Sequence, residues 1–181
     1  MKEFNDAIPT FAADGLIHAV IDTPQGSRNK YKYDTQLRTF KLSRVLPLGM
    51  CFPYDFGFIP NTAGADGDAL DVLVLVETPS FVGCLMHVNL VGVIQAEQIE
   101  SGHSLRNDRL IAVAETPVNK PVVRNLDEVS AAALEELEQF FINYNRIHGR
   151  EFRPLGRSGP SMAQQLLEAG MRDYRQERAS L

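Results

Sequence analysis

The sequence predicts an α+β fold, in which a small closed barrel of about five strands is followed by two C-terminal helices. Residues 16–114 alternate short β-branched, apolar segments with glycine-rich corners, a pattern typical of small barrels. Residues 125–148 then change to a helical period, and a second helical segment begins at 158. With 181 residues, 44% of them hydrophobic, the chain can bury a sizeable core, so we expect one domain over residues 1–181.

The strand candidates come first along the chain. They are the apolar or alternating segments at 16–22, 30–34, 37–46, 71–76, 85–96 and 108–114. The turn signal TPQGSRN closes the first of them, and the next two are expected to pair as a hairpin. The segment DVLVLV at 71–76 is short, β-branched and apolar, as expected for a strand buried on both faces.

The helical part has recognisable start signals. Asn125 is the expected N-cap of the first helix, with Glu128 three residues later as in a capping box. The second helix is expected to start at residues 158–160, Ser-Gly-Pro, with proline at its first position. One apolar stripe is expected on the first helix from residues at three- and four-residue steps, namely Leu134, Leu137, Phe141, Tyr144 and Ile147.

Composition excludes several functional classes. Lysine and arginine number 18 against 23 acidic residues, a net charge of -5, which disfavours a nucleic-acid or anionic-membrane partner. The N-terminus has no signal-peptide pattern, and no apolar run reaches the roughly 18 residues of a membrane span. We therefore expect a cytoplasmic protein. Cys51 and Cys84 lack metal-site spacing and are expected to be reduced core thiols.

Three aspartates crowd the entrance to the DVLVLV strand. Asp66 and Asp68, with glycines around them, could stabilise a turn, but a turn does not explain Asp71 inside the apolar segment. A calcium loop would need glycine at the position where Asp71 stands. The remaining interpretation is a hard-cation site that shares Mg²⁺ with phosphate oxygens. It would use cations from the preceding and following segments, namely Lys30, Lys32, Lys41, Arg44 and Arg109.

Taken together, these motifs resemble those of the family I soluble inorganic pyrophosphatases. The family signature Asp-x-Asp-[Pro/Glu]-apolar-Asp-apolar reads DGDALDV at 66–72, with Ala69 at the Pro/Glu position. Upstream, DTPQGSRNKYKYD and RVLPLGMCFPYDFGFIPNT resemble further family motifs, and FFINYN resembles Phe-Phe-x-x-Tyr-Lys on the long helix. The resemblance covers about residues 15–150. It implies an OB-like five-stranded barrel with flanking helices, in agreement with the pattern above.

The resemblance also implies a mechanism and roles. Mg²⁺, or alternatively Mn²⁺ or another divalent cation, would bind between carboxylates and pyrophosphate and lower the pKa of an attacking water. Asp66 and Asp71 would be metal ligands, and Asp68 would accept the proton of that water. The phosphate-binding positions are Lys30, Arg44, Arg109 and Tyr144, with Arg109 standing where the family has lysine.

Several site positions depart from the family pattern. Asp22 replaces a glutamate, Lys32 replaces a metal-binding glutamate, and Phe52 and Phe56 replace tyrosines. Asn145 replaces the lysine that follows the helix tyrosine. Two further metal-binding aspartates of the family align with neutral residues in a longer segment, and the candidate positions and substitutes are Gln98, Asn107, Glu97, Glu100 and Asp108.

Three functions stay open on the sequence. The first is a working pyrophosphatase with a rearranged metal shell. The second is a catalytically impaired or altered-substrate relative that binds a metal-phosphate ligand such as a nucleotide. The third is an OB-type scaffold for protein or nucleic-acid contact, whose nucleic-acid version the net charge disfavours. The resemblance also implies a homo-oligomer, since bacterial members are typically hexamers.

Overall fold

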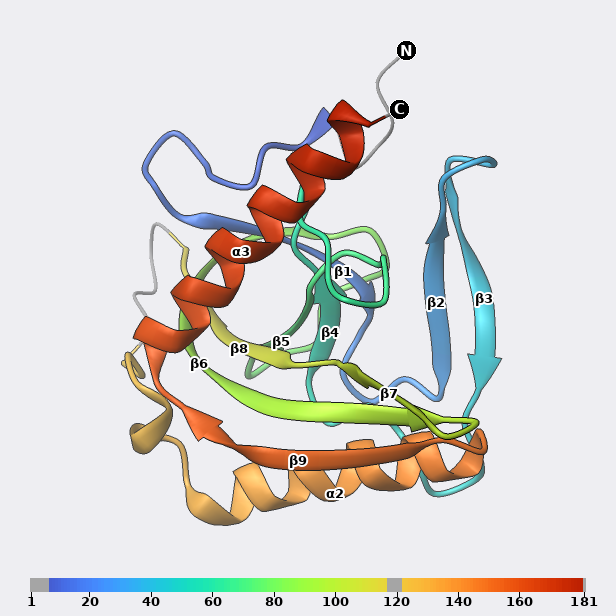
Figure 1. The fold of residues 1–181 in the computed structure, drawn as a ribbon. Helices are drawn as coiled ribbons and strands as arrows, with labels where there is room; N and C mark the ends of the chain where they lie inside the picture. Colours follow the sequence, from blue (N-terminus) through green and yellow to red (C-terminus); the bar gives the residue numbers. More distant parts are fainter. Residues whose placement is uncertain (1–6, 117–121, 181) are drawn as a thin grey trace.

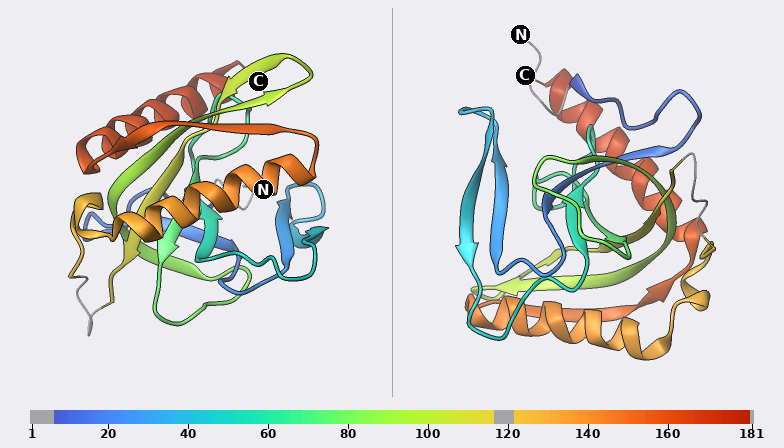
Figure 2. Two further views of the ribbon diagram at one scale, coloured as in Figure 1. Left: turned by 90° about the horizontal axis from the view of Figure 1, so that it is seen from below. Right: turned by 180° about the vertical axis from the view of Figure 1, so that it is seen from behind.

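The computed structural model describes residues 7–116 and 122–180, and five of its strands form a closed ring (Figures 1 and 2). Around the ring they are β1 (Ile17–Thr23), β4 (Asp55–Phe58), β5 (Asp71–Leu75), β8 (Arg109–Ala114) and β6 (Leu85–Glu100). Pairing of β1 with β6 closes the ring, and only β5 and β8 run parallel. The predicted closed barrel is confirmed.

The predicted hairpin forms but stays outside the ring. Among the described residues, strands β2 (Asn29–Asp34) and β3 (Thr39–Val45) pair only with each other, and they stand beside the barrel (Figure 1). Their place in the ring is taken by β4, a four-residue strand of sequence DFGF that the sequence pattern did not reveal. A strand this short, with glycine inside it, carries too little alternation to be recognised.

Strand β6 continues beyond the ring and organises a second sheet region. It extends to Glu100, past the predicted end at residue 96, and there pairs with β7 (His103–Arg106) and β9 (Glu151–Ser158). Strand β9 escaped prediction because a proline and a glycine interrupt its sequence, EFRPLGRS. This extension carries the 97–108 segment to the mouth of the barrel.

The caps of the first helix differ from the prediction. Asn125 caps a short 3₁₀ turn, η1 (Leu126–Glu128), by accepting a hydrogen bond from the Asp127 amide. Helix α2 (Ala131–Ile147) begins later, where the Ser130 hydroxyl accepts from the Ala133 amide at 3.1 Å. The second helix, α3 (Pro160–Ala179), begins at the predicted proline.

Each helix covers a different part of the barrel. Helix α2 lies along β9 and α3 lies along β6 (Figure 1). The predicted stripe of α2 is buried at Leu134, Leu137 and Phe141, whereas Ile147 is 48% exposed. In β5, Leu73 packs on the α2 side and Val72 and Val74 on the α3 side. The prediction that this strand is buried on both faces is therefore confirmed.

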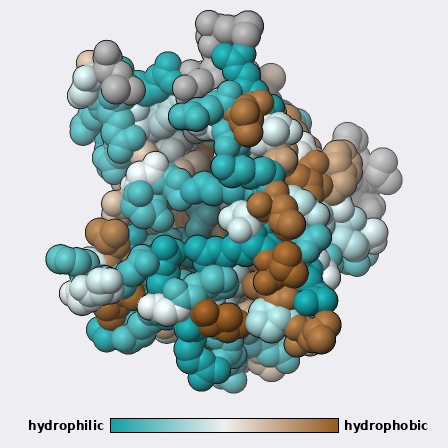
Figure 3. Space-filling view, turned by 90° about the vertical axis from the view of Figure 1, so that its right-hand side faces the viewer, coloured by the Kyte–Doolittle hydropathy of each residue, from teal (hydrophilic) through white to brown (hydrophobic). Residues whose placement is uncertain are grey.

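The described surface is mixed in polarity. On the face of the molecule that carries the β2–β3 hairpin, hydrophilic residues separate the exposed apolar ones (Figure 3). Cys51 is exposed and Cys84 half-buried, so the expectation that both thiols lie in the core was wrong. Within the described residues, no helix combines the length and apolar character that a membrane crossing requires.

We expect Gly57→Ala to destabilise the barrel strongly. A Cβ at Gly57 would lie 2.0 Å from the Val20 carbonyl oxygen, so β1 and β4 would have to separate. A loss of about 3 kcal/mol or more in the free energy of unfolding is expected, the upper range for overpacking. Denaturant titration measures it.

The control is Gly64→Ala, where the nearest atom is the flexible Asp66 carboxylate at 3.2 Å. If both variants unfold at the same denaturant concentration, the close approach of β1 to β4 is not a constraint on stability.

Candidate active site

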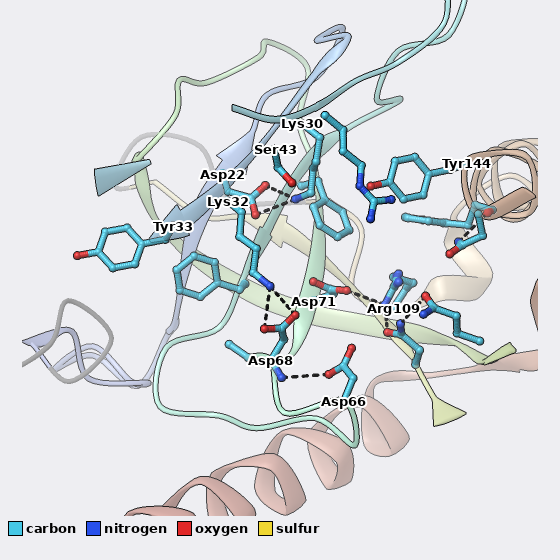
Figure 4. Close-up of a pocket in the computed structure, with 18 of the residues that line it drawn as sticks. Asp22, Lys30, Lys32, Tyr33, Ser43, Asp66, Asp68, Asp71, Arg109 and Tyr144 are labelled. Atoms are coloured by element: carbon cyan, nitrogen blue, oxygen red, sulfur yellow. Dashed lines mark hydrogen bonds and ion pairs between the residues drawn. The ribbon is translucent and has the colours of Figure 1, made fainter. Parts of the chain in front are cut away.

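A cavity of about 520 Å³ opens between one end of the barrel, the β2–β3 hairpin and the C-terminal part of α2 (Figure 4). Charged side chains from distant parts of the sequence line it. Among its lining residues are Asp22, Lys30, Lys32, Arg44, Phe52, Phe56, Asp66, Asp68, Asp71, Gln98, Asn107, Arg109, Tyr144 and Arg150. Of the candidate site residues singled out from the sequence, four do not line it, namely Lys41, Glu97, Glu100 and Asp108.

The acidic loop is a turn that aims its carboxylates into the cavity. The Asp66 carboxylate accepts a hydrogen bond from the Asp68 amide at 3.1 Å, and Gly67 between them has a positive φ of 78°. The turn interpretation is therefore correct for Asp66. It leaves Asp68 and Asp71 unexplained, because Asp71 is the first residue of β5 and its side chain faces the cavity.

Three carboxylates of the cavity each contact a cation (Figure 4). Lys30 Nζ lies 2.6 Å from Asp22, and Arg109 Nη1 lies 2.7 Å from Asp71. The third pair, Lys32 with Asp68 at 2.7 Å, is more open, with side chains 55% and 59% exposed. Cations of the hairpin and of β8 thus balance the acidic loop and β1.

Burial disfavours the ionised forms of two of these carboxyls. Desolvation raises the pKa of Asp22 above its ordinary value, although Lys30 opposes the change. Desolvation likewise raises the pKa of Asp71, with Arg109 opposing. Because the folded-state pKa of each carboxyl is raised, its contribution to the free energy of unfolding is present at low pH. That contribution is lost as pH rises through the folded-state pKa. The fold therefore bears these charges at neutral pH at a cost.

Arg109 is the most constrained cation of the site. It is only 5% exposed, and its guanidinium lies over the rings of Phe141 and Phe152, at 5.1 and 5.6 Å from their centroids. Its Nη1 also donates to the Asn107 side-chain oxygen and the Asp108 carbonyl. Its Nε atom is buried and has no hydrogen-bond partner among the described residues. A buried, unsatisfied donor beside a cavity favours an anionic ligand.

An aromatic wall completes the cavity. Lys30 Nζ lies 4.2 Å from the centroid of the Phe56 ring, a cation–π contact. Phe52 packs against Phe56 and against Tyr144, whose pKa is raised by burial. Phe52 and Phe56 bring no hydroxyl, so Tyr144 supplies a phenol on the α2 side of the cavity.

The segment before Arg109 places neutral groups in the cavity and its acids outside. Asn107 Nδ2 donates to Gln98 Oε1 at 3.2 Å, and both residues line the cavity. Glu97 and Glu100 are instead held by Arg153 and Arg150, and Asp108 accepts from the Ala96 amide and from Arg106. Asp108 is thus not a lining residue, contrary to its candidate role.

Two further observations concern α2 and its end. Asn145 is buried, lines the cavity and donates one amide hydrogen to the Phe141 carbonyl one turn back. Arg150, which sequence reasoning missed, reaches the cavity after the turn at Gly149 and contacts Glu100 at 2.9 Å. No local motif marks Arg150, because only the return of the chain into β9 brings it there.

The donor chemistry fits a hard cation that is shared with a phosphate ligand. Within residues 7–116 and 122–180, no three His, Cys, Asp or Glu side chains form a closed metal cluster. Mg²⁺ does not need one, because it retains waters and is commonly held by one or two carboxylates plus phosphate oxygens. Asp66 and Asp71 offer such a pair in this cavity.

Comparison with known proteins agrees with this geometry. The family model "Inorganic pyrophosphatase" matches residues 19–175. The Synechocystis inorganic pyrophosphatase is 32% identical over 168 residues, 93% of this chain and 97% of the relative. That of Halalkalibacterium halodurans is 38% identical over 136 residues, 75% of this chain and 81% of the relative.

Solved structures extend the comparison. The Thermus thermophilus inorganic pyrophosphatase superimposes with a TM-score of 0.84 at 31% identity, covering 93% of this chain and 97% of that one. The Helicobacter pylori enzyme gives 0.81 at 27% identity, covering 97% and 98%. Family model, relatives and fold agree over nearly the whole chain, and the chain belongs to the family I inorganic pyrophosphatases.

Proposed function

We propose that this cavity hydrolyses inorganic pyrophosphate to two phosphates with the help of Mg²⁺. Membership in the family supports the reaction. The observation that carries it here is the meeting of an acidic loop with fixed cations around one cavity, including the buried Arg109 with its unsatisfied Nε–H. Pyrophosphate carries several negative charges and oxygen acceptors, which suit such a lining.

In this proposal Lys30, Arg44, Arg109 and Tyr144 hold the phosphates. Lys30 and Arg109 are already held in place by their carboxylate partners and by aromatic rings. Donors that are fixed before the ligand arrives do not have to reorganise during the reaction, which is the main source of electrostatic stabilisation. Arg44 comes from β3, opposite Lys30 in the hairpin register, so the hairpin supplies two of these cations.

Asp66 and Asp71 would hold Mg²⁺ at the base of the cavity. Bound there with the substrate, Mg²⁺ would neutralise phosphate charge and lower the pKa of a bound water. Arg109 would stay in place and pair with a phosphate oxygen while the Asp71 carboxylate turns to Mg²⁺, so neither charge would be left unpaired. Their 2.7 Å contact makes this a local rearrangement.

Asp68 would accept the proton of the attacking water. Its side chain is 59% exposed on the loop, within reach of solvent in the cavity. Lys32 contacts both of its oxygens, at 2.7 and 2.9 Å. A carboxylate has about four lone-pair positions, so Lys32 can orient Asp68 and still leave an acceptor position for water.

A second candidate is an altered or impaired phosphate-binding site. Two observations favour it. The Gln98–Asn107 pair is neutral, and the Lys32 ammonium on Asp68 is itself positive, so neither supplies a negative charge that would help to bind a cation. Phosphate release from pyrophosphate and from nucleoside triphosphates, each with Mg²⁺ or Mn²⁺, separates the candidates. Fast release from pyrophosphate supports the first, and release only from triphosphates, or none, supports the second.

The expected homo-oligomer stays a prediction.

Asp71→Asn should abolish the Mg²⁺-dependent activity while the fold is kept. We expect hydrolysis to fall at least about 100-fold, the usual loss of one transition-state contact. Asn is nearly isosteric, so the fold should be kept. The melting temperature without Mg²⁺ should fall modestly, because the buried Arg109 loses its charged partner, whereas the rise of the melting temperature with Mg²⁺ should disappear.

The matched control is Asp108→Asn, the same change on a carboxylate outside the cavity. It should keep activity within about twofold, because this carboxylate faces the Ala96 amide and Arg106 and not the cavity. A parental Mg²⁺ response in Asp71→Asn would remove Asp71 from the metal site.

Lys32→Met should strengthen the response to Mg²⁺. The Lys32 ammonium places a positive charge beside the acidic loop, where it repels a bound cation. Lys32 and Asp68 are both exposed, so the repulsion between the ammonium and a bound cation is screened as in water and amounts to about 1 kcal/mol at 4 Å. Without it, the half-saturating Mg²⁺ concentration should fall about fivefold. Lys41→Met, which removes a partner of Asp34 outside the cavity, is the control. Equal Mg²⁺ curves for the two variants would contradict this role.

The double change Gln98→Asp with Asn107→Asp should accelerate pyrophosphate hydrolysis, by about tenfold or more if it returns over 1.4 kcal/mol of stabilisation. The two amides touch at 3.2 Å, so two aspartates there would repel each other without Mg²⁺ and share it when present. The melting temperature should fall without Mg²⁺ and recover with it.

Each single change should gain less than half of the double, because the two carboxylates would act as a unit. Glu97→Asp is the control, because neither Glu97 nor its neighbour Arg153 lines the cavity. Slower hydrolysis by the double variant, with the parent already fast, would show that the neutral pair belongs to this active site.

A further inference from the structure

Two histidines meet at the seam that closes the barrel, away from the cavity. His18 on β1 lies opposite His87 on β6 in the antiparallel register. The His18 amide donates outward to the Thr10 carbonyl, and the His87 carbonyl accepts from Glu115 on the far side. Because these backbone groups turn away from each other's strand, the pair is of the non-hydrogen-bonded kind, in which side chains come closest.

The two imidazoles face each other through the same ring atom. His18 Nε2 and His87 Nε2 are 3.3 Å apart, and the ring planes are inclined by 49°. Two imidazole nitrogens that share a tetrahedral Zn²⁺ at 2.0–2.1 Å are separated by about 3.3 Å. The spacing therefore already matches that of a two-histidine metal site.

The other ring nitrogens face oxygen atoms. His18 Nδ1 lies 2.6 Å from the Pro9 carbonyl oxygen, which can only accept, so this nitrogen carries the proton. In the neutral ring the lone pair is then on Nε2, directed at His87. His87 Nδ1 faces the Asp14 carboxylate at 3.8 Å, and the Leu16 amide holds that carboxylate by its other oxygen. A carbonyl partner such as that of His18 is known to orient histidines that bind metals, and the Asp14 carboxylate places a negative charge near His87.

Exposure permits an ion to enter. His18 is only 7% exposed, which fixes one ligand, whereas the His87 side chain is 42% exposed and opens to solvent. We propose that His18 and His87 form a binding site for one divalent transition-metal ion such as Zn²⁺, with water in the remaining coordination positions. No third His, Cys, Asp or Glu among the described residues completes a cluster, so this is a two-ligand protein site.

This site differs from the cavity in chemistry and position. Imidazole selects Zn²⁺, Ni²⁺ or Cu²⁺ over Mg²⁺, whereas the cavity offers carboxylate oxygens. His87 lies near the start of β6, and Gln98 of the cavity lies near its other end. A metal ion held by both histidines would tie β1 to β6, the pairing that closes the ring, and would stabilise the fold by binding linkage.

The test is a Zn²⁺ titration of the metal-stripped protein in buffer with excess Mg²⁺, which keeps the carboxylate sites filled. Calorimetry should show one Zn²⁺ per chain, and the melting temperature should rise by several degrees. Both effects should disappear in His87→Gln, which changes a half-exposed side chain. They should persist in His103→Gln, the control on the exposed strand β7.

Proton–nitrogen correlation spectra of the imidazoles give a readout that does not depend on stability. Zn²⁺ should shift the Nε2 signals of His18 and His87 and leave those of His103 and His148 unchanged. Equal Zn²⁺ stabilisation of the parent and His87→Gln would overturn the site. Loss of Zn²⁺ binding in Asp71→Asn would also overturn the site, because it would assign the ion to the cavity. The absence of Zn²⁺ binding by the parent would overturn it as well.

Discussion

The parallel pairing of β5 with β8 is the constraint on which the site depends. Val72 pairs with Leu110, so the first residues of the two strands, Asp71 and Arg109, start side by side at the same end of the barrel. Antiparallel neighbours would have placed the start of one strand beside the end of the other. The 2.7 Å contact between a carboxylate and a guanidinium at the mouth of the barrel follows from this single parallel pair.

The elements around that pair supply matched charges. The hairpin stands outside the ring, so it can present Lys30 and Lys32 toward the barrel mouth, where they meet Asp22 and Asp68. Such pairs offset only part of the cost of burying charge, as the raised pKa values of Asp22 and Asp71 show. An arrangement that costs stability in order to concentrate charge is typical of sites that bind and transform charged ligands.

The long strand β6 sets the composition of the opposite wall. Its extension beyond the ring carries Gln98 into the cavity, and the return through β7 brings Asn107 beside it. Alternation along β6 sends Glu97 to the face opposite Gln98, toward Arg153 on β9. Glu100 shares the face of Gln98, but it lies at the end of the strand, where Arg150 holds it at 2.9 Å. This wall is therefore neutral although the segment as a whole is acidic.

The sequence by itself determined the barrel-then-helices order, the hairpin, both buried faces of β5 and the charged cavity residues other than Arg150. These features depend on local signals, namely apolar alternation, a helical period, and aspartates and lysines in recognisable motifs. Only the tertiary structure decided that β4 replaces the hairpin in the ring, that Arg150 reaches the cavity, and that Asp108 does not. The histidine pair also belongs to this second group. Each of these depends on which strands become neighbours, and strand neighbours are set by long-range pairing that no short stretch of sequence encodes.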